Sequence, residues 1–532
     1  MSRRIRRVYI VVLLLMHVPW LSSCVTNPVT GETELGLVSE AQERELGRKN
    51  YGPYRQAQGG DYVADPELVR YVKQVGERIA VHADRKLPYE FNVVNDSSPN
   101  AWALPGGKIA INRGLLVELQ NEAELAAVLA HEVVHAAARH SAQSMERNLL
   151  FQGALIAAGV ALGDSDYAEV GRLGAQIGTA AGQQYYSREA EREADHYGMK
   201  YMVRAGYDPN AAVELQQTFV RLAENKNSSW IEGLFASHPP SPERVANNRK
   251  LFAELGKPGG ELGEQRYRKA IARLVRTKPA YEAYDKARLA FKEKQFDKAL
   301  ALVDKAIKVE SQEAAFHTLR GEIHAAKGNH KTALRSYDKA MGLNPGYYKV
   351  SLARGLLHRE LNNTQAARKD LTRSRELLPT ANGEYALGLL ERDFGNMQDA
   401  VAHFRNAAKV DSAVGRAAAD QLEKMQQPLR RSAVSGAMHL TGPVDWVQTG
   451  LSLNRDNKLV LSLRNTGAKT VEDIQVLLLE LRGGRLRQLG HFRTDFRIAP
   501  GQTVRAATGI GPVSSARFRS LSVKVKQVRE AN

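Results

Sequence analysis

The chain is poor in cysteine, because Cys24 is the only one among its 532 residues. An intrachain disulfide is therefore excluded, and a lone thiol in an exported protein needs another explanation. Long hydrophobic runs are also scarce. The mostly apolar stretch at residues 8–21 has 14 positions and includes His17 and Pro19. A transmembrane helix needs about 20 apolar residues, so a polytopic membrane protein is excluded.

Acidic residues are in short supply relative to basic ones. The 58 Asp and Glu face 75 Lys and Arg, which gives a net charge of +17. Residues 432–532 alone hold 15 basic and 7 acidic residues. A basic segment of this kind suits nucleic acid, anionic lipid or an acidic protein. Because we expect export and find no aromatic RNA-binding motif, we expect no nucleic-acid partner.

The first 24 residues have the features of a bacterial export signal, with arginines before the apolar stretch and small residues after it. The tetrad from Leu21 to Cys24 resembles a lipobox, whose cysteine is acylated and becomes the mature N-terminus. We expect residues 1–23 to be a lipoprotein signal peptide and Cys24 to be the lipidation site. Val25 then favours the outer membrane of a double-membraned bacterium. A plain signal peptide and a soluble periplasmic product are the alternative.

The remaining sequence predicts three domains, in line with about 150 residues per domain. The first domain, residues 24–257, opens with a tether, and from about residue 37 to 255 it mixes helical patterns with short strands at 89–94 and 108–112. A glycine-rich stretch at 256–263 marks the boundary. Residues 438–532 alternate with period two and predict a small β-sandwich. Strands are expected at residues 459–467 and 471–481, around Val504 and at 523–528.

Between these two domains, small residues recur at a fixed period. They have spacings of 34, 34 and 33, and an alanine follows each one twelve positions later. The pattern resembles tetratricopeptide repeats, whose paired helices need small residues where they cross. We therefore expect an α-solenoid over residues 264–427, with the first repeat the weakest match because it has alanine instead of glycine. The recurring positions are Ala287, Gly321, Gly355 and Gly388.

The strongest chemical signal lies in residues 121–143, which are helical by composition. His131 and His135 are four residues apart and share a helix face, so both imidazoles can reach one metal at about 2.0–2.1 Å. Glu132 is placed to hold a water molecule and take its proton. A satisfied surface histidine pair on an alanine-rich helix is the structural alternative.

Two histidines do not complete a catalytic zinc site, so a third ligand must come from elsewhere. Residues 187–202 offer one on a second helix. Glu191 can bind the metal, while Asp195, one turn later, can orient a ligand imidazole. Glu189 and Glu193 are the nearby alternatives, but they lie two residues from Glu191 and point away from its face.

With these motifs and the stretch NAWALPGGKIAINRGLL at residues 100–116, the chain resembles the HtpX and CAAX-prenyl-protease group of gluzincin metallopeptidases. The similarity is greatest to its exported branch that carries tetratricopeptide repeats, and it does not reach the β segment. The resemblance implies a mainly helical zincin domain within a multidomain α+β chain. It also implies one zinc ion per chain, held by His131, His135 and Glu191, with Glu132 as general base and Asp195 orienting a ligand.

The same resemblance implies a substrate-binding strand. Its backbone would pair with an extended peptide, although a Pro-Gly turn feeding a purely structural strand is the alternative. Integral-membrane relatives have further spanning helices, whereas we expect residues 149–163 to form a buried or groove-covering helix. The matching strand residues are Asn100, Ala101, Trp102 and Ala103.

His238, between Ser237 and Pro239, matches a motif that brings a histidine back to the metal. It can act as a fourth ligand that blocks the site, as a catalytic partner of the oxyanion, or as a structural residue only. We favour the blocking role, because the following prolines can hold the loop rigidly. Arg244 is a weaker candidate for the same neighbourhood.

These observations favour a zinc-dependent endopeptidase that is tethered to the outer membrane and faces the periplasm. We expect it to degrade misfolded or stalled envelope proteins, with repeats that bind clients or the outer-membrane β-barrel assembly machinery. A chaperone or assembly scaffold with little or gated proteolysis is the alternative. A third hypothesis is a module that binds anionic lipid or nucleic acid through its basic C-terminal segment, and the expected export disfavours nucleic acid.

Overall fold

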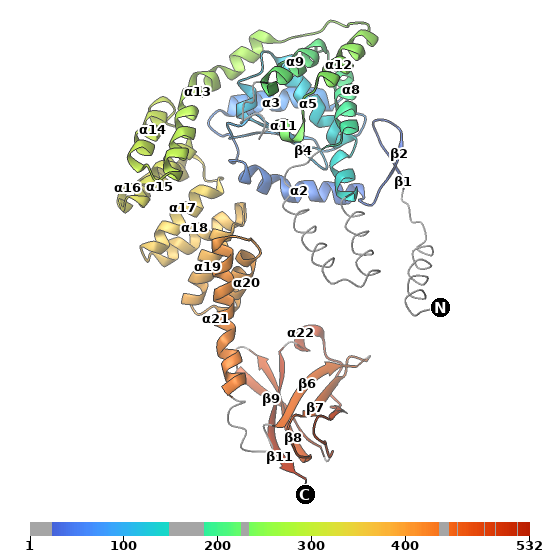
Figure 1. Ribbon diagram of the computed structural model, residues 1–532, viewed down its shortest axis with the longest axis vertical. Helices are drawn as coiled ribbons and strands as arrows, with labels where there is room; N and C mark the ends of the chain where they lie inside the picture. Colours follow the sequence, from blue (N-terminus) through green and yellow to red (C-terminus); the bar gives the residue numbers. More distant parts are fainter. Residues whose placement is uncertain are drawn as a thin grey trace. The chain divides into compact units, whose positions relative to one another are not determined.

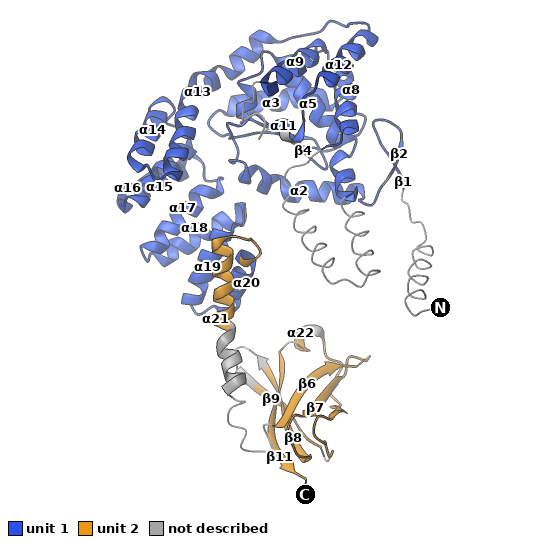
Figure 2. Ribbon diagram, viewed as in Figure 1, with its two compact units in different colours: residues 1–407 blue, residues 408–532 orange. Residues whose placement is uncertain are grey.

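The structure is a computed structural model and describes residues 24–147, 186–224, 234–435 and 446–531, apart from 455, 483–484, 495 and 519. It divides into two compact units, residues 1–407 and residues 408–532 (Figure 2). The predicted multidomain α+β architecture is confirmed, with helices dominating the first unit and small sheets in the second. No helix among the described residues is both long and apolar enough to span a bilayer.

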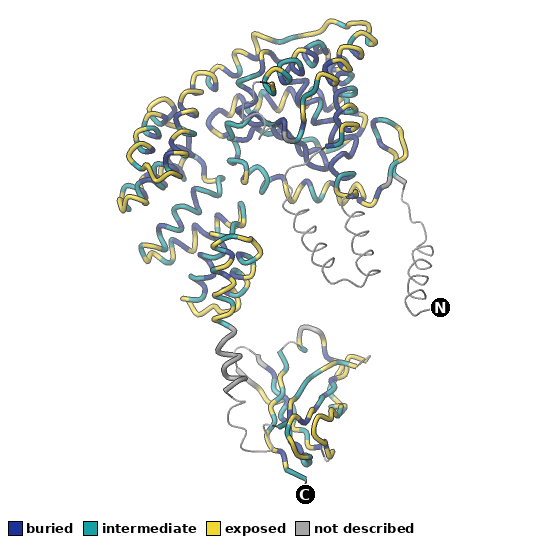
Figure 3. Tube along the Cα trace, in the orientation of Figure 1, coloured by how far each residue is buried: buried dark blue, intermediate teal, exposed yellow. Residues whose placement is uncertain are grey.

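The N-terminal part of the first unit packs helices around a small sheet (Figure 1). Buried residues concentrate in these helices and strands (Figure 3). In chain order, the described elements are β1 (Cys24–Thr26), β2 (Thr33–Leu35), α2 (Glu40–Ala57), α3 (Pro66–Ala80), β3 (Glu90–Val94), β4 (Ala101–Leu104), β5 (Lys108–Asn112), α4 (Arg113–Leu116), α5 (Glu122–Ala137), α8 (Arg188–Arg204), α9 (Asn210–Glu224), α11 (Leu234–Ser237) and α12 (Pro242–Glu254).

The sheet has the order β3-β5-β4, so β4 is an edge strand. β3 and β5 run parallel, while β4 pairs antiparallel with β5 and places Trp102 opposite Ala110. All residues of β4 and β5 are buried, as expected for strands covered on both faces. The strand predicted at residues 108–112 is found there, and the one predicted at 89–94 begins one residue later.

The helical segment that carries the histidine pair is interrupted. α5 begins with Asn121 as its N-cap, whose side chain accepts from the Glu124 amide, and it ends at Ala137, after which helical structure resumes at residue 140. Arg139 then adopts a left-handed backbone conformation with φ of 64°. That conformation is costly for a residue with a Cβ. Here the buried Arg139 guanidinium stabilises it by pairing with Glu43 and Glu146.

The segment after Cys24 is not the plain tether that the sequence suggested. β1 and β2 pair antiparallel, with Cys24 opposite Leu35. Asn27, in the turn between them, is fully buried, and its side-chain amide donates to Glu34 and to Glu193 of α8. This hairpin therefore packs against the second helix of the candidate site.

The predicted repeat segment consists of paired antiparallel helices. Their small residues lie where the two helices of one repeat cross. A Cβ added to Gly321 would come within 2.5 Å of the Tyr337 ring, and one at Gly388 within 2.7 Å of Phe404. The helices are α13 (Glu264–Lys292), α14 (Phe296–Val309), α15 (Ala314–Ala326), α16 (His330–Leu343), α17 (Tyr348–Glu360), α18 (Thr364–Leu377), α19 (Ala381–Asp393) and α20 (Met397–Ala408).

The first repeats share a hydrophobic core with the helices around the sheet. One cluster of buried side chains includes Val72 and Leu129 together with Phe316 and Ile323. In addition, Gln56 of α2 donates to the Gly346 carbonyl at 2.7 Å and accepts from the Tyr348 amide at 2.9 Å. The first repeats are therefore fixed to the N-terminal part of the first unit by a shared core and by hydrogen bonds.

The second unit contains two antiparallel three-stranded sheets, with orders β10-β7-β6 and β11-β8-β9, around a core that includes Leu461 and Val476. The predicted strands are present. Two further strands, β6 and β9, were not predicted. The elements are α21 (Ala413–Ser435), β6 (Val447–Leu453), β7 (Leu459–Asn465), β8 (Val471–Arg482), β9 (Arg485–Thr494), β10 (Thr503–Ala507), α22 (Ser515–Phe518) and β11 (Leu521–Glu530).

Two predictions lie outside the described residues. They concern the export signal at residues 1–23 and the groove-covering helix at residues 149–163. Both stay predictions.

Candidate metal centre

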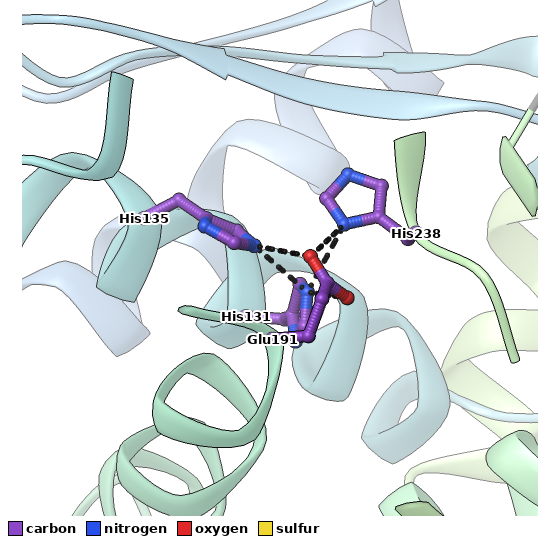
Figure 4. A group of neighbouring side chains, drawn as sticks. All are labelled: His131, His135, Glu191 and His238. Atoms are coloured by element: carbon purple, nitrogen blue, oxygen red, sulfur yellow. Dashed lines mark hydrogen bonds and ion pairs between the residues drawn. The ribbon is translucent and has the colours of Figure 1, made fainter. Parts of the chain in front are cut away.

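Four side chains from three parts of the fold converge on one point (Figure 4). His131 and His135 come from α5, Glu191 comes from α8, and His238 follows α11. One ligand atom of each lies within 4.8 Å of the ligand atoms of the other three. Three imidazole nitrogens and one carboxylate oxygen are a donor set that suits zinc.

The separations within this cluster are short. His131 Nε2 lies 3.0 Å from His135 Nε2 and 3.3 Å from His238 Nδ1. Glu191 Oε1 lies 2.9 Å from His238 Nδ1 and 3.3 Å from His135 Nε2. The second ring nitrogen of His238, Nε2, is buried without a hydrogen-bond partner among the described residues. Three imidazole nitrogens and a carboxylate oxygen that crowd one point at these distances fit a cation between them.

Local sequence explains why the two helices meet so closely. α8 begins at Ser187, whose hydroxyl accepts from the Ala190 amide, and this N-cap fixes the start of the helix that carries Glu191. Farther along α8, Gly198 faces α5, and a Cβ there would lie 3.4 Å from the backbone nitrogen of His131. The small residue therefore lets the backbones approach, which brings Glu191 within reach of the histidine pair.

Glu132 lies beside the cluster and is only 1% exposed. Burial raises the pKa of its carboxyl, because the charged form loses hydration, and nearby His238 and His131 oppose this only in part. Its Oε1 lies 3.4 Å from His238 Nε2, and its Oε2 has no hydrogen-bond partner among the described residues. A carboxyl of raised pKa next to a metal site is suited to accepting a proton and releasing it again.

Asp195 and Arg244 support the ligands from behind. Asp195 Oδ1 lies 3.0 Å from His131 Nδ1, which leaves the other ring nitrogen directed at the cluster. Arg244 donates to both oxygens of Asp195 at 2.7 Å and lies 2.8 Å from Glu191 Oε2. Burial alone would raise the pKa of Asp195, but Arg244 and His131 outweigh it and lower the pKa.

The charges of the cluster act on each other strongly. Burial alone would raise the pKa of Glu191, but His238, Arg244 and His131 outweigh it and hold the pKa well below its usual value. Burial alone would lower the pKa of His131, but the carboxylates of Glu191 and Asp195 outweigh it and raise the pKa to about 10. A cation at this position would compete with that proton for the same lone pair.

The predicted substrate strand borders the centre. Its residues Asn100 and Ala103 differ in their partners. The Ala103 carbonyl accepts from Ser141 Oγ at 3.4 Å and from the Tyr186 hydroxyl at 3.3 Å, whereas Asn100 Oδ1 is buried without a partner. The Tyr186 ring also stacks on His135, with ring centroids 3.8 Å apart. Tyr186 therefore contacts both the edge strand β4 and the metal ligand His135.

Glu189 and Glu193 do not join the cluster. Glu189 is largely exposed and pairs with Arg192, while Glu193 accepts from Asn27 on the side of α8 toward the hairpin. The structure thus brings together the predicted ligands, base and orienting acid.

Residues 66–251 match the profile of peptidase family M48. They form an M48 peptidase domain. Residues 284–348 match a tetratricopeptide-repeat profile, and the M48 domain ends ahead of them.

Named relatives of this domain are proteases. The beta-barrel assembly-enhancing protease of Escherichia coli O157:H7 is 31% identical over 241 residues, which is 44% of this chain and 48% of that protein. The mitochondrial metalloendopeptidase OMA1 of Schizosaccharomyces pombe is 37% identical over 186 residues, which is 35% of this chain and 53% of that protein. The chain thus spans about half the length of these relatives.

Sequence reasoning missed two neighbours of the M48 centre. One is Tyr186, which directly precedes the N-cap of α8 and could have been noticed for that position. The other is His140, which lies 2.8 Å from His135 through their Nδ1 atoms. His140 is five residues beyond His135, a spacing that an unbroken helix would turn away. The left-handed residue Arg139 interrupts the helix and thereby places the His140 ring beside His135.

Proposed function

We propose that the chain is a zinc-dependent endopeptidase. The observation that carries this proposal is the convergence of His131, His135 and Glu191, with the buried Glu132 beside them. These three side chains would hold the zinc ion. When bound, zinc supplies Lewis-acid polarisation of the scissile carbonyl and acidifies water.

The remaining steps belong to the side chains. Glu132 takes the proton of the attacking water and passes it to the leaving amine, for which its raised pKa is suited. Asp195 fixes the ring of His131 through Nδ1. Arg244 keeps both Asp195 and Glu191 charged, which favours metal binding over protonation.

His238 closes this centre at rest in our proposal. Its Nδ1 approaches Glu191 Oε1 at 2.9 Å and His131 Nε2 at 3.3 Å, and its Nε2 points toward Glu132. A catalytic zinc site needs an open position for water, whereas four protein ligands are typical of a closed site. Activation then requires the loop after α11 to withdraw His238.

The proposed substrate path runs along β4. Its edge carries no strand partner on the side away from β5 among the described residues. An extended peptide can pair there through the backbone of residues Asn100 to Ala103. The Ser141 and Tyr186 hydroxyls occupy the Ala103 carbonyl, so a substrate must displace them.

We further propose that acylated Cys24 holds the protein on the periplasmic face of the outer membrane, with a soluble periplasmic form as the alternative. Its substrates would be misfolded or stalled envelope proteins. The name of the bacterial relative supports a role beside the β-barrel assembly machinery. Repeats of stacked helix pairs offer a concave surface for a client or partner. Acyl labelling of Cys24→Ala beside the wild type tests the anchor, and labelling that persisted would contradict it.

A second candidate function is a scaffold or chaperone with gated proteolysis. The close approach of His238 to the ligands favours it, because a closed centre can persist while the repeats bind clients. In this case client binding, and not cleavage, would be the main activity.

One comparison separates these functions. Cleavage of an unfolded model substrate and zinc content are measured for the wild type, Glu132→Gln and Glu191→Ala. We expect Glu132→Gln to keep zinc and lose cleavage, and Glu191→Ala to lose zinc. Equal cleavage by the wild type and Glu132→Gln would contradict the protease. Client binding without cleavage in any variant would support the scaffold.

A further inference from the structure

His140 lies directly behind one of the metal ligands. It is 1% exposed, and its Nδ1 is 2.8 Å from the Nδ1 of His135. His135 directs its other nitrogen, Nε2, at the metal cluster, 3.0 Å from His131 Nε2. A short N to N contact between two imidazoles requires that one of them donates a proton and the other accepts it.

We propose that His140 is a positioning residue for the metal ligand His135, and that the N-terminal hairpin holds His140 in place. The inference rests on the proposed zinc site. A ligand imidazole must keep a lone pair on the nitrogen that binds the metal. His135 must then carry its proton on Nδ1 and donate it to His140 Nδ1. This hydrogen bond fixes both the tautomer and the ring orientation of His135.

The donor and acceptor roles continue outward from His140. If its Nδ1 accepts, the neutral ring carries its proton on Nε2. The nearest carboxylate to that nitrogen is Glu193 Oε1 at 3.5 Å, which is too long for a hydrogen bond, and Nε2 has no other partner among the described residues. Glu193 is thus the acceptor that a small movement would bring into contact.

The hairpin determines where Glu193 lies. Asn27, which is fully buried, donates from one amide nitrogen to Glu193 Oε1 at 3.1 Å and to Glu34 at 2.9 Å. Gln143 donates to the other oxygen of Glu34 at 2.5 Å, which ties the hairpin to the segment just after His140. A series of polar contacts therefore leads from the hairpin through Glu193 to His140 and the metal ligand His135, with one open step of 3.5 Å between Glu193 and His140.

This arrangement gives the hairpin a role beyond packing. The hairpin begins at Cys24, so the residue expected to bear the lipid is eleven positions from Leu35 and within the same paired strands. Displacing the hairpin would remove the support of Glu193 and leave His140 free to turn. The affinity of the metal centre is then coupled to the folded state of the N-terminus.

The test measures zinc affinity by competition with a chromophoric chelator, using full-length apo-protein. Loss of a hydrogen-bond partner behind a metal ligand typically weakens metal binding by about 10–100-fold. We expect a loss of this size for His140→Leu, which has no acceptor. We expect His140→Asn to recover most of the affinity, because its amide oxygen can occupy the position of Nδ1. His196→Leu, a substitution on α8 away from the cluster, is the matched control and should bind zinc like the wild type.

Two further variants test the hairpin. Asn27→Leu and Glu193→Gln should each weaken zinc binding by several-fold, with little change in the melting temperature of the apo-protein. Equal zinc affinity in the wild type, His140→Leu and Glu193→Gln would overturn the inference and leave the zinc site intact. Failure of the wild type to bind zinc would instead overturn the proposed function. A loss in His140→Leu that His140→Asn did not recover would assign a packing role and also overturn the inference.

Discussion

At the scale of residues, charge balance is the main feature of the metal centre. Three buried carboxylates, Glu132, Glu191 and Asp195, face the single guanidinium of Arg244. Burying charge without compensation is costly. With all three carboxylates ionised and the ligand histidines neutral, as metal binding requires, a divalent cation brings the formal charge of this group to zero, whereas a monovalent one does not. The side chains are thus matched to a divalent ion by charge as well as by donor type.

The role of His238 can be decided by one substitution. If it closes the centre, His238→Ala should raise the rate of proteolysis and promote self-cleavage, because the position for water opens. If it stabilises the oxyanion, the same change should lower the rate by about 10²–10³. Initial rates of cleavage of an unfolded substrate, measured at equal zinc content, distinguish the expected increase from the expected decrease. Unchanged rates at unchanged stability would rule out both roles.

Glu124, in the first turn of α5, should make stability depend on pH. Burial raises its pKa to about 7 from an ordinary value of 4.5. The folded state therefore holds the proton more tightly than the unfolded state. This contribution to stability is complete below about pH 4.5 and is lost as the pH rises through about 7.

Glu124→Gln removes this titration and keeps an oxygen acceptor for the Gln120 amide. At pH 8 we expect the variant to be more stable than the wild type by up to about 3 kcal/mol, and at pH 4 equally stable. Urea unfolding between these pH values measures the difference. Parallel stability curves for the two proteins would contradict the prediction.

At the scale of elements, sequence reasoning succeeded where spacing within one segment decides the structure. The histidine pair, the Glu191 helix and the repeat period all rest on such spacing. It failed at Arg139, because a left-handed residue in a helix becomes stable only through ion pairs with Glu43, almost a hundred positions earlier, and with Glu146. It also missed His140, whose place depends on that break.

The repeats show why the first one departs from the pattern. In the later repeats, a large residue stands sixteen positions after each glycine, as Tyr337 does after Gly321 and Phe404 after Gly388. In the first repeat the corresponding residue is the smaller Val303. The smaller Val303 leaves room for the Cβ of Ala287. Both residues of this contact therefore differ from their counterparts in the later repeats.

This explanation predicts a change of sign in a double-mutant cycle. Gly321→Ala alone should destabilise the protein by about 1–3 kcal/mol, because the added Cβ meets the Tyr337 ring. In a Tyr337→Val background, the same substitution should be neutral or stabilising by up to about 1 kcal/mol, since alanine is the better helix former. Thermal unfolding of the four proteins gives the cycle. Equal destabilisation in both backgrounds would show that the contact is not the cause.

At the scale of the whole molecule, we expect that the second unit is not required for peptide cleavage. It has its own core, and its described residues contribute no member to the metal cluster. Removing residues 438–532 should therefore leave cleavage of an unfolded substrate within about twofold of the full chain, a change of less than about 0.5 kcal/mol in the activation barrier. Because the unit is basic, the deletion should instead weaken a salt-sensitive partner interaction. Loss of general proteolysis would show that this unit supports the catalytic fold.

The hydrophobic core that joins the M48 domain to the first repeats has a genetic consequence. Because Phe316 and Ile323 belong to the same cluster as Leu129 of the histidine helix, a cavity made in the repeats weakens the scaffold of the metal centre. A screen for loss of proteolysis would then recover substitutions in α15 alongside those in the ligands. Phenotype alone would not reveal which part of the chain performs the chemistry. Suppressors of such α15 mutants should map to residues of the M48 domain that pack against α15 in the shared core.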